Sequence, residues 1–288
     1  MNCRICQGPS GVIGEKQGKL AHRSFILRRC QVCQFSFVEN PWLDYAAIYD
    51  SAYYEGRGAD PSVDYHFELV NPDRTIRQFE WSGIVEVVGK LTALNSQTRW
   101  LDFGCGNGGL VRHVRANVGC ESIGIEEGAI APFARAAGIP VFDSAELASV
   151  EGTFDVVTAI EVLEHAVDPL ASLQQIRRFL RRGGVFFYTT VNALPQRHRL
   201  LEWDYFVPEI HISLYEPLSM ETALRRTGFE PRFMGYISGW DRIMAFKILK
   251  GLQRRTTSAL YRAIPWRALT PAINKRFGLY DFPVAFAK

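Results

Sequence analysis

The chain has 288 residues, of which 47% are hydrophobic and 22% are charged, and its formal net charge is +3. This length is enough for one substantial domain and a small accessory module. No apolar run reaches 18 residues, so we expect no membrane-spanning helix, and the modest charge does not by itself indicate a nucleic-acid partner. The first ten residues lack the apolar centre of a signal peptide, which favours a cytoplasmic location.

The first expected element is a small metal-binding module over residues 1–40. It contains two CxxC pairs separated by 23 residues, formed by Cys3, Cys6, Cys30 and Cys33. Two such pairs in an intracellular chain are typical of four thiolates around one zinc ion, and two disulfides or redox pairs are the less favoured alternative. Four cysteines leave no open coordination position, so we expect a structural zinc that helps a module of about 40 residues to fold. Alternating apolar and polar residues around the second pair predict the strands of a zinc ribbon.

Residues 41–72 are rich in tyrosine and contain several glycines, which predicts a linker or a mobile flap. Within it, Tyr53 and Tyr54 are candidates to close over a ligand as a lid, and Tyr54 is also a candidate catalytic residue. The alternative is that these tyrosines only anchor the flap to the core. A helix is expected at about 73–94, with Pro72 suited to its start.

Short apolar runs then alternate with amphipathic segments, as strands alternate with helices. The expected strands cover residues 99–103, 122–126, 139–143, 154–162 and 185–191. The expected helices between them cover residues 109–118, 129–138 and 168–184, the last closed by Gly183 and Gly184. Further on we expect a helix at 217–228, a strand at 229–239 and a final antiparallel strand at 277–288. Continuous apolar strands indicate a sheet covered by helices on both faces, so the fold class is α/β with an open, doubly wound, mostly parallel sheet.

Residues 242–276 contain nine arginines and lysines and no acidic residue, interleaved with apolar side chains. This pattern predicts that the insertion at 241–276 forms a basic amphipathic helix. Such a helix can lie on an anionic membrane, here the inner membrane surface, or contact a phosphorylated substrate. The alternative is an ordinary solvated insertion that covers the sheet.

The turn after the first strand of the sheet, "LDFGCGNGG", is the most informative motif. Gly104, Gly106 and Gly109 match GxGxxG literally, and no Lys-Ser/Thr pair follows, which excludes a phosphate loop of the GxxxxGK[ST] type. The glycine spacing alone leaves a dinucleotide and another nucleotide-like ligand open. Asp102 favours a ligand with a cationic group, because a carboxylate would repel a pyrophosphate. Glu126 ends the second strand about 20 residues later, where it can bind ribose hydroxyls.

Residues 100–192 resemble the class I S-adenosylmethionine-dependent methyltransferases. "LDFGCGNGG" corresponds to the first motif of that family, "GIE" to its ribose-binding acid, and "FDVVTAIEVLEH" to its fourth-strand motif. "RRFLRRGGVFFYTT" corresponds to the helix, turn and strand that follow. The resemblance implies a Rossmann-like core with a seven-stranded sheet over residues 73–240.

The same resemblance implies which residues bind S-adenosylmethionine. Gly104 and Gly106 let the backbone approach the cofactor, Asp102 lies near the methionyl part, and Glu126 binds the ribose. Asp143 or Ser144 is a contact near the adenine, and Glu161 faces the cofactor. His165, in the dipeptide after the fourth strand, is a candidate catalytic residue; helix capping or packing in the pocket is its alternative role.

A four-cysteine ribbon before a tyrosine-rich segment and such a core is also similar to sugar C-methyltransferases and to methyltransferases of polysaccharide and natural-product gene clusters. This resemblance implies a small-molecule or glycan acceptor, such as a nucleotide- or lipid-linked sugar. The segment "VPEIHISLYEP" departs from the Tyr-His-Glu-His pattern of the sugar enzymes, so transfer to oxygen or nitrogen is at least as well supported as transfer to carbon. It retains His211, whose imidazole suits a general base at neutral pH, although fixing the loop is an equally good role.

Three other functions stay open at this point. One is a zinc-ribbon RNA methyltransferase; we do not expect a nucleic-acid partner, because the ribbon has no stripe of basic and aromatic residues. Another is a non-catalytic module that binds S-adenosylmethionine. The last is an NAD-dependent oxidoreductase, which rests on the literal GxGxxG alone.

Overall fold

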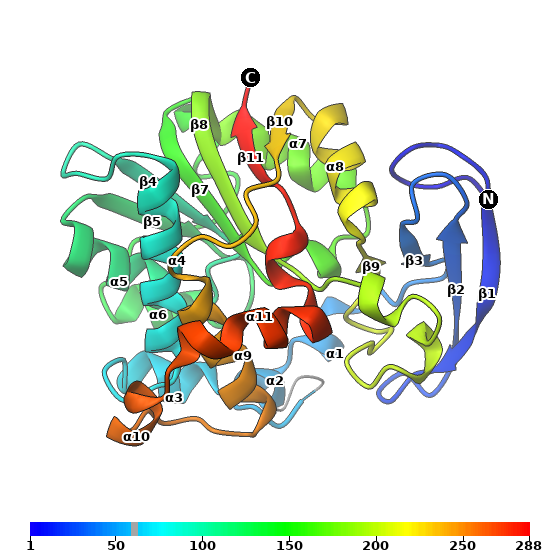
Figure 1. The fold of residues 1–288 in the computed structure, drawn as a ribbon, viewed down its shortest axis with the longest axis horizontal. Coiled ribbons are helices and arrows are strands. Elements are labelled where there is room, and N and C mark those ends of the chain that lie inside the picture. Colours follow the sequence, from blue (N-terminus) through cyan, green and yellow to red (C-terminus); the bar gives the residue numbers. More distant parts are fainter. Residues whose placement is uncertain (59–62) are drawn as a thin grey trace.

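The computed structural model describes residues 1–58 and 63–288, so residues 59–62, within the predicted flap at 41–72, lie outside the described part of the chain. Two sheets organise the fold (Figure 1). The smaller has the strand order β1-β2-β3-β9, and the larger has the order β10-β11-β8-β7-β4-β5-β6. Residues far apart in the sequence therefore meet in the same sheet.

The seven-stranded sheet confirms the predicted fold class. Its parallel strands are β4 (Arg99–Phe103), β5 (Glu121–Ile125), β6 (Val141–Phe142), β7 (Phe154–Ile160) and β8 (Leu180–Thr189). At one edge β11 (Val284–Ala287) runs antiparallel to β8, and β10 (Phe229–Arg232) runs antiparallel to β11. The chain passes from β4 to β5 and β6 on one side and returns to β7 on the other, which places a topological switch point at β4.

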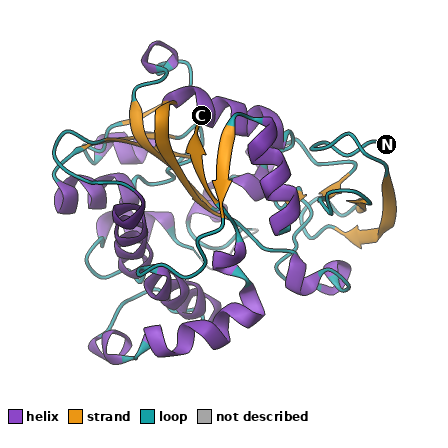
Figure 2. Cartoon of the chain, turned by 45° about the horizontal axis from the view of Figure 1, so that its top comes forward, coloured by secondary structure: helices purple, strands orange, loops and turns teal. Residues whose placement is uncertain are grey.

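Helices cover both faces of this sheet (Figure 2). They include α4 (Arg77–Leu91), α5 (Gly109–Val118), α6 (Ala131–Ala136), α7 (Pro169–Phe179) and α8 (Pro217–Arg226). Neighbouring strand residues point to opposite faces: Trp100 packs in one buried cluster with α4 and α5, and Leu101 packs in another with α7 and α8. Both faces are buried, and this is why the strands read as continuous apolar runs.

Two predicted helices differ from the structure. The helix expected at 168–184 ends at Phe179, because the chain already pairs with β7 at Leu180, and Gly183 lies inside β8 with a φ of 75°. The helix expected from Pro72 begins only at Arg77. Residues 71–76 form turns instead, and Arg74 accepts a backbone hydrogen bond from Thr257.

The N-terminal residues form a small antiparallel sheet of β1 (Ser10–Gln17), β2 (Ser24–Cys30) and β3 (Ser36–Val38). The spacer between the two CxxC pairs is thus the β1–β2 hairpin. The fourth strand, β9 (Ser213–Leu214), comes much later in the sequence, after β8 of the larger sheet, and pairs with β3. Figure 1 shows this sheet at one side of the molecule, next to β9.

The described part of residues 41–72 is helical. It contains α1 (Tyr45–Ile48), α2 (Ser51–Tyr54) and α3 (Tyr65–Val70). An aspartate caps the N-terminus of each helix through its side chain, which satisfies backbone N–H groups that such short helices leave unpaired. Short 3₁₀ turns complete the secondary structure: η1 (Ala148–Val150), η2 (Leu163–His165), η3 (Leu194–Gln196), η4 (Leu200–Glu202) and η5 (Leu279–Asp281).

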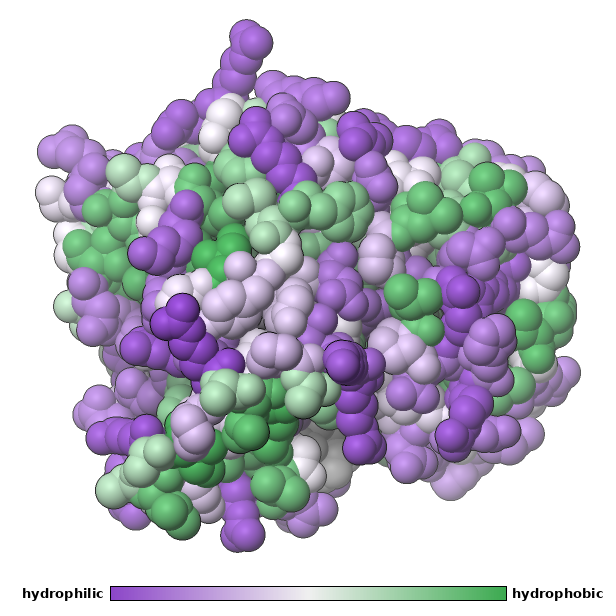
Figure 3. Space-filling model, viewed as in Figure 1, coloured by the Kyte–Doolittle hydropathy of each residue, from purple (hydrophilic) through white to green (hydrophobic). Residues whose placement is uncertain are grey.

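The basic insertion forms α9 (Trp240–Gly251), α10 (Ala259–Ala263) and α11 (Trp266–Phe277) rather than one amphipathic helix. Ile243 and Phe246 of α9 are buried, so the apolar residues of this helix pack into the protein and do not form an exposed stripe. Leu252 and Leu260 are exposed, and hydrophobic residues gather over this insertion at the lower left of Figure 3. Within the described residues, no helix combines the length and apolarity needed to cross a membrane.

Candidate active site

A cavity of about 640 Å³ lies at the carboxyl ends of β4, β5 and β7. Its walls come from the glycine-rich turn after β4, from Glu126 after β5, and from residues 160–165 at the end of β7. Tyrosines of α1, α2 and α3 cover it from the other side. This is where open α/β sheets bind ligands, and the volume is in the range of small-molecule sites.

We call the part of the cavity formed by Asp102, Gly104, Gly106 and Glu126 the glycine end. Gly104 and Gly106 have φ values of 72° and 56°, which side chains rarely adopt. A Cβ atom on Gly104 would lie 2.6 Å from Val162, and one on Gly106 would lie 2.8 Å from Tyr65. Both glycines line the cavity, and the close packing of Val162 and Tyr65 leaves no room for a side chain at either position.

The carboxylate of Glu126 is held by the backbone of this turn. One oxygen accepts from the Gly106 N–H at 2.9 Å and the other from the Gly128 N–H at 2.7 Å. Burial raises the pKa of Glu126, while these two N–H groups lower it. Because its orientation is fixed before any ligand binds, Glu126 is suited to hold a pair of hydroxyl groups.

Asp102 is buried at the floor of the glycine end, where its carboxylate accepts from the Thr158 hydroxyl at 2.7 Å. Burial is the main cause that raises the pKa of Asp102 to about 7. No ion pair with Asp102 occurs among the described residues. A desolvated carboxylate without a cation would gain stability from a positively charged ligand, as expected for a sulfonium group.

Glu161 has a φ of 55° at the end of β7, a strained backbone conformation of the kind found at functional sites. Its carboxylate forms an ion pair with Lys247 of α9 at 2.8 Å. Burial raises the pKa of Glu161, but Lys247 outweighs that effect and lowers it to about 2. Lys247 also lies 3.5 Å from Glu80, which pairs with Arg77 at 2.5 Å, so a buried chain of charges connects α9 and α4 to the cavity.

Lys247 does not line the cavity itself, but it pairs with the cavity-lining Glu161, and sequence reasoning missed it. It stands between Phe246 and Ile248 in an otherwise apolar stretch, and a lysine there is an unusual occupant of a buried helix face. A lysine within an apolar stretch was therefore the sequence feature that could have indicated a buried ion pair. Its partner, however, lies 86 positions earlier in the chain, after β7.

The opposite part of the cavity, the histidine end, contains Glu164, His165, Tyr205 and His211. Nδ1 of His211 lies 2.6 Å from the Tyr205 carbonyl oxygen, and Nδ1 of His165 lies 2.8 Å from the Ile210 carbonyl oxygen. A carbonyl oxygen only accepts, so each Nδ1 donates in these contacts, and in a neutral imidazole of this tautomer the lone pair lies on Nε2. The centroids of the two imidazole rings are 5.3 Å apart.

Tyr205, another residue absent from the sequence prediction, organises this end. Its ring stacks on His211 with a centroid distance of 4.3 Å. Its hydroxyl donates to Glu164 at 3.2 Å, and Thr190 donates to the other oxygen of Glu164 at 2.7 Å. Burial and the nearby charge of Glu161 raise the pKa of Glu164 to about 8, so this carboxyl group is mostly protonated at neutral pH.

The structure thus brings most of the predicted site residues to one cavity and leaves out two. Asp143 and Ser144 do not line it, because β6 is only two residues long and Asp143 closes the next turn through hydrogen bonds with Glu146. Tyr54 is buried at the glycine end next to Gly128. Burial and the charge of Glu126 raise the pKa of Tyr54, which favours a wall or lid role over that of a base.

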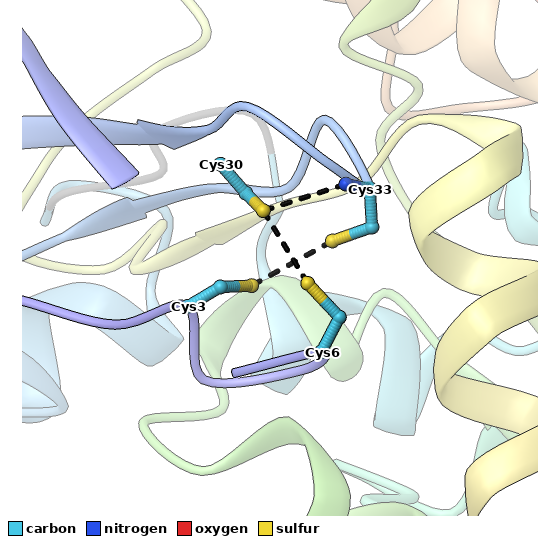
Figure 4. Close-up of side chains that lie close together, drawn as sticks. All are labelled: Cys3, Cys6, Cys30 and Cys33. Atoms are coloured by element: carbon cyan, nitrogen blue, oxygen red, sulfur yellow. Dashed lines mark hydrogen bonds between the residues drawn. The ribbon is translucent and has the colours of Figure 1, made fainter. Parts of the chain in front are cut away.

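The four cysteines form a separate cluster (Figure 4). The Sγ atoms of Cys3 and Cys33 are 3.6 Å apart, those of Cys6 and Cys30 are 3.4 Å apart, and all four lie within 4.8 Å of one another. Tetrahedral Zn–S bonds require sulfur atoms about 3.8 Å apart, so the donor set fits one zinc ion. The four cysteines are free thiols, which does not favour the disulfide alternative.

Comparisons with known proteins agree with this geometry. A family model described as a methyltransferase domain matches residues 74–232, more than half of the chain. The ubiquinone biosynthesis O-methyltransferase of Rhizobium etli is 30% identical over 149 residues, which are 46% of this chain and 60% of that protein. Its namesake in Pseudomonas aeruginosa is 35% identical over 109 residues, 34% of this chain and 46% of the relative. The chain thus spans 60% or less of these curated relatives.

Among solved structures, the fold is similar to phosphoethanolamine N-methyltransferase 2 of Haemonchus contortus, determined in complex with S-adenosyl-L-methionine. The TM-score is 0.52 at 16% sequence identity, and the match covers 88% of this chain and 61% of that one. At this identity the similarity concerns the fold.

Proposed function

The chain belongs to the methyltransferase domain family, and on this premise we propose that it transfers a methyl group from S-adenosylmethionine to a hydroxyl oxygen of a small-molecule or carbohydrate-type acceptor. The observation that carries the proposal is one cavity with two different ends. The glycine end offers backbone and carboxylates to the cofactor, and the histidine end offers a base to the acceptor. The name of the O-methyltransferase relatives supports oxygen as the methylated atom.

At the glycine end, the turn at Gly104 and Gly106 accommodates the cofactor, Glu126 binds its ribose hydroxyls and Asp102 faces its cationic part. When bound, S-adenosylmethionine supplies a methyl group on a positively charged sulfur that is already a good leaving group. The protein therefore has to align the acceptor and remove one proton. Burial of Asp102 strengthens its attraction to a cation.

At the histidine end, His211 is the general base. Its Nε2 accepts the proton of the acceptor hydroxyl, while its Nδ1–H remains bonded to the Tyr205 carbonyl. The stacked Tyr205 ring keeps the imidazole in this orientation, and the protonated Glu164 adds no negative charge beside the reacting oxygen. Proton transfer of this type typically contributes about 10² to 10⁴ in rate.

The test is calorimetry with S-adenosylhomocysteine and with NADH. We expect the wild type to bind S-adenosylhomocysteine and not NADH, and Glu126→Ala to weaken that binding about 10- to 100-fold, because charged hydrogen bonds to the ribose are lost. Glu121→Ala, at the exposed start of the same strand, is the matched control. Tight binding of NADH without S-adenosylhomocysteine would contradict the proposal. A methyl-transfer screen of phenols, nucleotide sugars and glycans then identifies the acceptor class.

We further propose that α9–α11 contact an anionic membrane surface, where a lipid-linked acceptor would be presented. The exposed apolar side chains Leu252, Leu260 and Leu269 lie in a segment, 242–276, that has nine arginines and lysines and no acidic residue. Three of these basic residues, Arg242, Lys247 and Arg255, pair with acidic residues elsewhere in the chain. This contact differs from the one expected from sequence, because the buried residues of α9 take no part in it.

A further inference from the structure

The three-stranded sheet of the ribbon at residues 1–40 is extended by a fourth strand from the main domain. β9 pairs with β3, with Ser36 opposite Leu214 and Phe37 opposite Ser213. At the next position along β3, the Val38 N–H donates to the carbonyl oxygen of Ile212, the residue before Ser213, at 2.9 Å. Ile212 directly follows His211, so the ribbon holds the backbone of the candidate base.

The other side of the same strand is attached to the turn that carries His165. The Ile212 N–H donates to the Glu164 carbonyl oxygen at 2.8 Å, and the Ser213 hydroxyl donates to the Ala166 carbonyl oxygen at 2.7 Å. β9 therefore lies between the ribbon and η2. His211 directly precedes Ile212, and His165 lies between Glu164 and Ala166, so both histidines are next to residues that take part in these hydrogen bonds.

Two arginines extend the connection from the cysteines themselves. Arg4, next to Cys3, donates to the carbonyl oxygens of Val38 at 2.8 Å and Val167 at 3.1 Å. Arg29, next to Cys30, forms an ion pair with the buried Glu216, three residues after β9 begins. A displacement of the cysteines would therefore act on Val167, which follows η2, and on Glu216, at the end of the segment that contains His211.

The buried side chains show the same continuity. Phe35, between the second CxxC pair and β3, lies 5.2 Å from Tyr215 and shares a buried cluster with Leu163. On the other face, Leu27 shares a buried cluster with Phe206 and Ile212. The ribbon has no core that is separate from the loop that carries Tyr205 and His211, unlike a module that folds alone to bind a distant partner.

We propose that the four-cysteine ribbon, with its metal bound, is the positioning element of the histidine end. The metal joins the two CxxC pairs. These pairs fix the position of β3, and β3 pairs with β9, the strand that follows His211. Loss of the metal should loosen residues 205–216 and leave the glycine end intact, since Glu126 is held by Gly106 and Gly128 of the core. This role of the ribbon in catalysis rests on the proposed function.

The test compares Cys33→Ser with Cys120→Ser, a buried cysteine outside the cluster. Four quantities are measured: metal content, affinity for S-adenosylhomocysteine, hydrogen exchange of residues 205–216, and kcat on an accepted substrate. We expect Cys33→Ser to lose the metal and its exchange protection at 205–216, to keep its affinity within about threefold, and to lose about 10²-fold in kcat through a misplaced base. Cys120→Ser should match the wild type.

Arg29→Met provides the second variant, because it cuts the link to Glu216 without removing a metal ligand. It should retain the metal and the affinity for S-adenosylhomocysteine while exchange at 205–216 rises and kcat falls. Unchanged exchange at 205–216 in metal-free Cys33→Ser would overturn the inference, as would loss of protection throughout the core. Failure of the wild type to bind S-adenosylhomocysteine would instead overturn the proposed function, and the exchange measurement would still decide whether the metal orders this segment.

Discussion

The two ends of the cavity are built in different ways. The glycine end consists of the turn that follows β4 and the carboxylate that follows β5, within a stretch of about 25 residues, the span of one βαβ unit. The histidine end combines η2 with the loop at 205–211, and this loop is held in turn by a ribbon from the N-terminus. The residues proposed to bind the cofactor thus come from one short stretch of the chain, and Thr158 and Tyr65 contact them from elsewhere. The placement of the base depends on long-range contacts.

The largest expected effect separates the two ends directly. His211→Gln should lower kcat about 10³-fold, because the imidazole that accepts the hydroxyl proton is lost, and should leave the affinity for S-adenosylhomocysteine unchanged. His113→Gln, at a half-buried histidine of α5 outside the cavity, is the control. Steady-state kinetics and calorimetry measure the two quantities. A parallel loss of affinity would show that the ends are not independent.

The next effect concerns the charge chain that joins α9 to the cavity. Lys247→Met should reduce the free energy of unfolding by about 3 kcal/mol at pH 7, because it leaves Glu161 buried without its cation. Urea unfolding measures this, and adding Glu161→Gln to the variant should restore most of the loss. Stability equal to the wild type in the single variant would contradict a stabilising ion pair.

The same pair predicts a pH dependence. The pKa of Glu161 in the folded state is about 2, below its ordinary value of 4.5, so the pair stabilises the fold fully above about pH 4.5. In Lys247→Met, burial without the lysine raises the pKa of Glu161 above 4.5, so the advantage of the wild type should begin to shrink above pH 4.5 and should go on shrinking towards pH 2. A difference that is constant over this range would assign the stabilisation to packing of the lysine stem.

A smaller effect tests the glycine end. Gly106→Ala should weaken S-adenosylhomocysteine binding about tenfold, because its Cβ would meet Tyr65 at 2.8 Å and disturb the backbone against which the cofactor lies. Gly119→Ala has the same kind of φ, 72°, and no atom within 4 Å of the added Cβ. Its affinity should be unchanged, which separates backbone strain from obstruction. An equal loss of affinity in both variants would show that backbone strain, and not obstruction by the added Cβ, weakens binding.

The smallest effect lies outside the cavity. Leu252→Ser with Leu260→Ser should reduce sedimentation with anionic liposomes several-fold, since each exposed leucine contributes only about 1–2 kcal/mol when it enters a membrane interface. Leu218→Ser, an exposed leucine of α8, is the control. Binding should also fall as salt rises. Equal sedimentation of all three proteins would remove the proposed membrane contact.

Local sequence predicted the elements that depend on neighbours in the chain. The runs at 99–103 and 109–118 match β4 and α5 residue for residue, because a strand buried on both faces and a helix capped by glycine each have a local signature. The glycine turn and the CxxC pairs were likewise recognisable, since φ requirements and ligand spacing are properties of a few consecutive residues. The loop that carries Asp143 and Ser144 has no such signature, and the predicted adenine contact of these two residues, which do not line the cavity, stays a prediction.

Sequence by itself therefore determined an α/β core with a nucleotide-like site and a four-thiolate cluster. Tertiary structure alone decided that Lys247 reaches Glu161, that Tyr205 stacks on His211, and that β9 joins the ribbon to the main domain. It also decided that the apolar residues of α9 face inward. The physical reason is that these contacts join residues far apart in the chain, and their energies come from burial and charge pairing that exist only once the sheets have assembled.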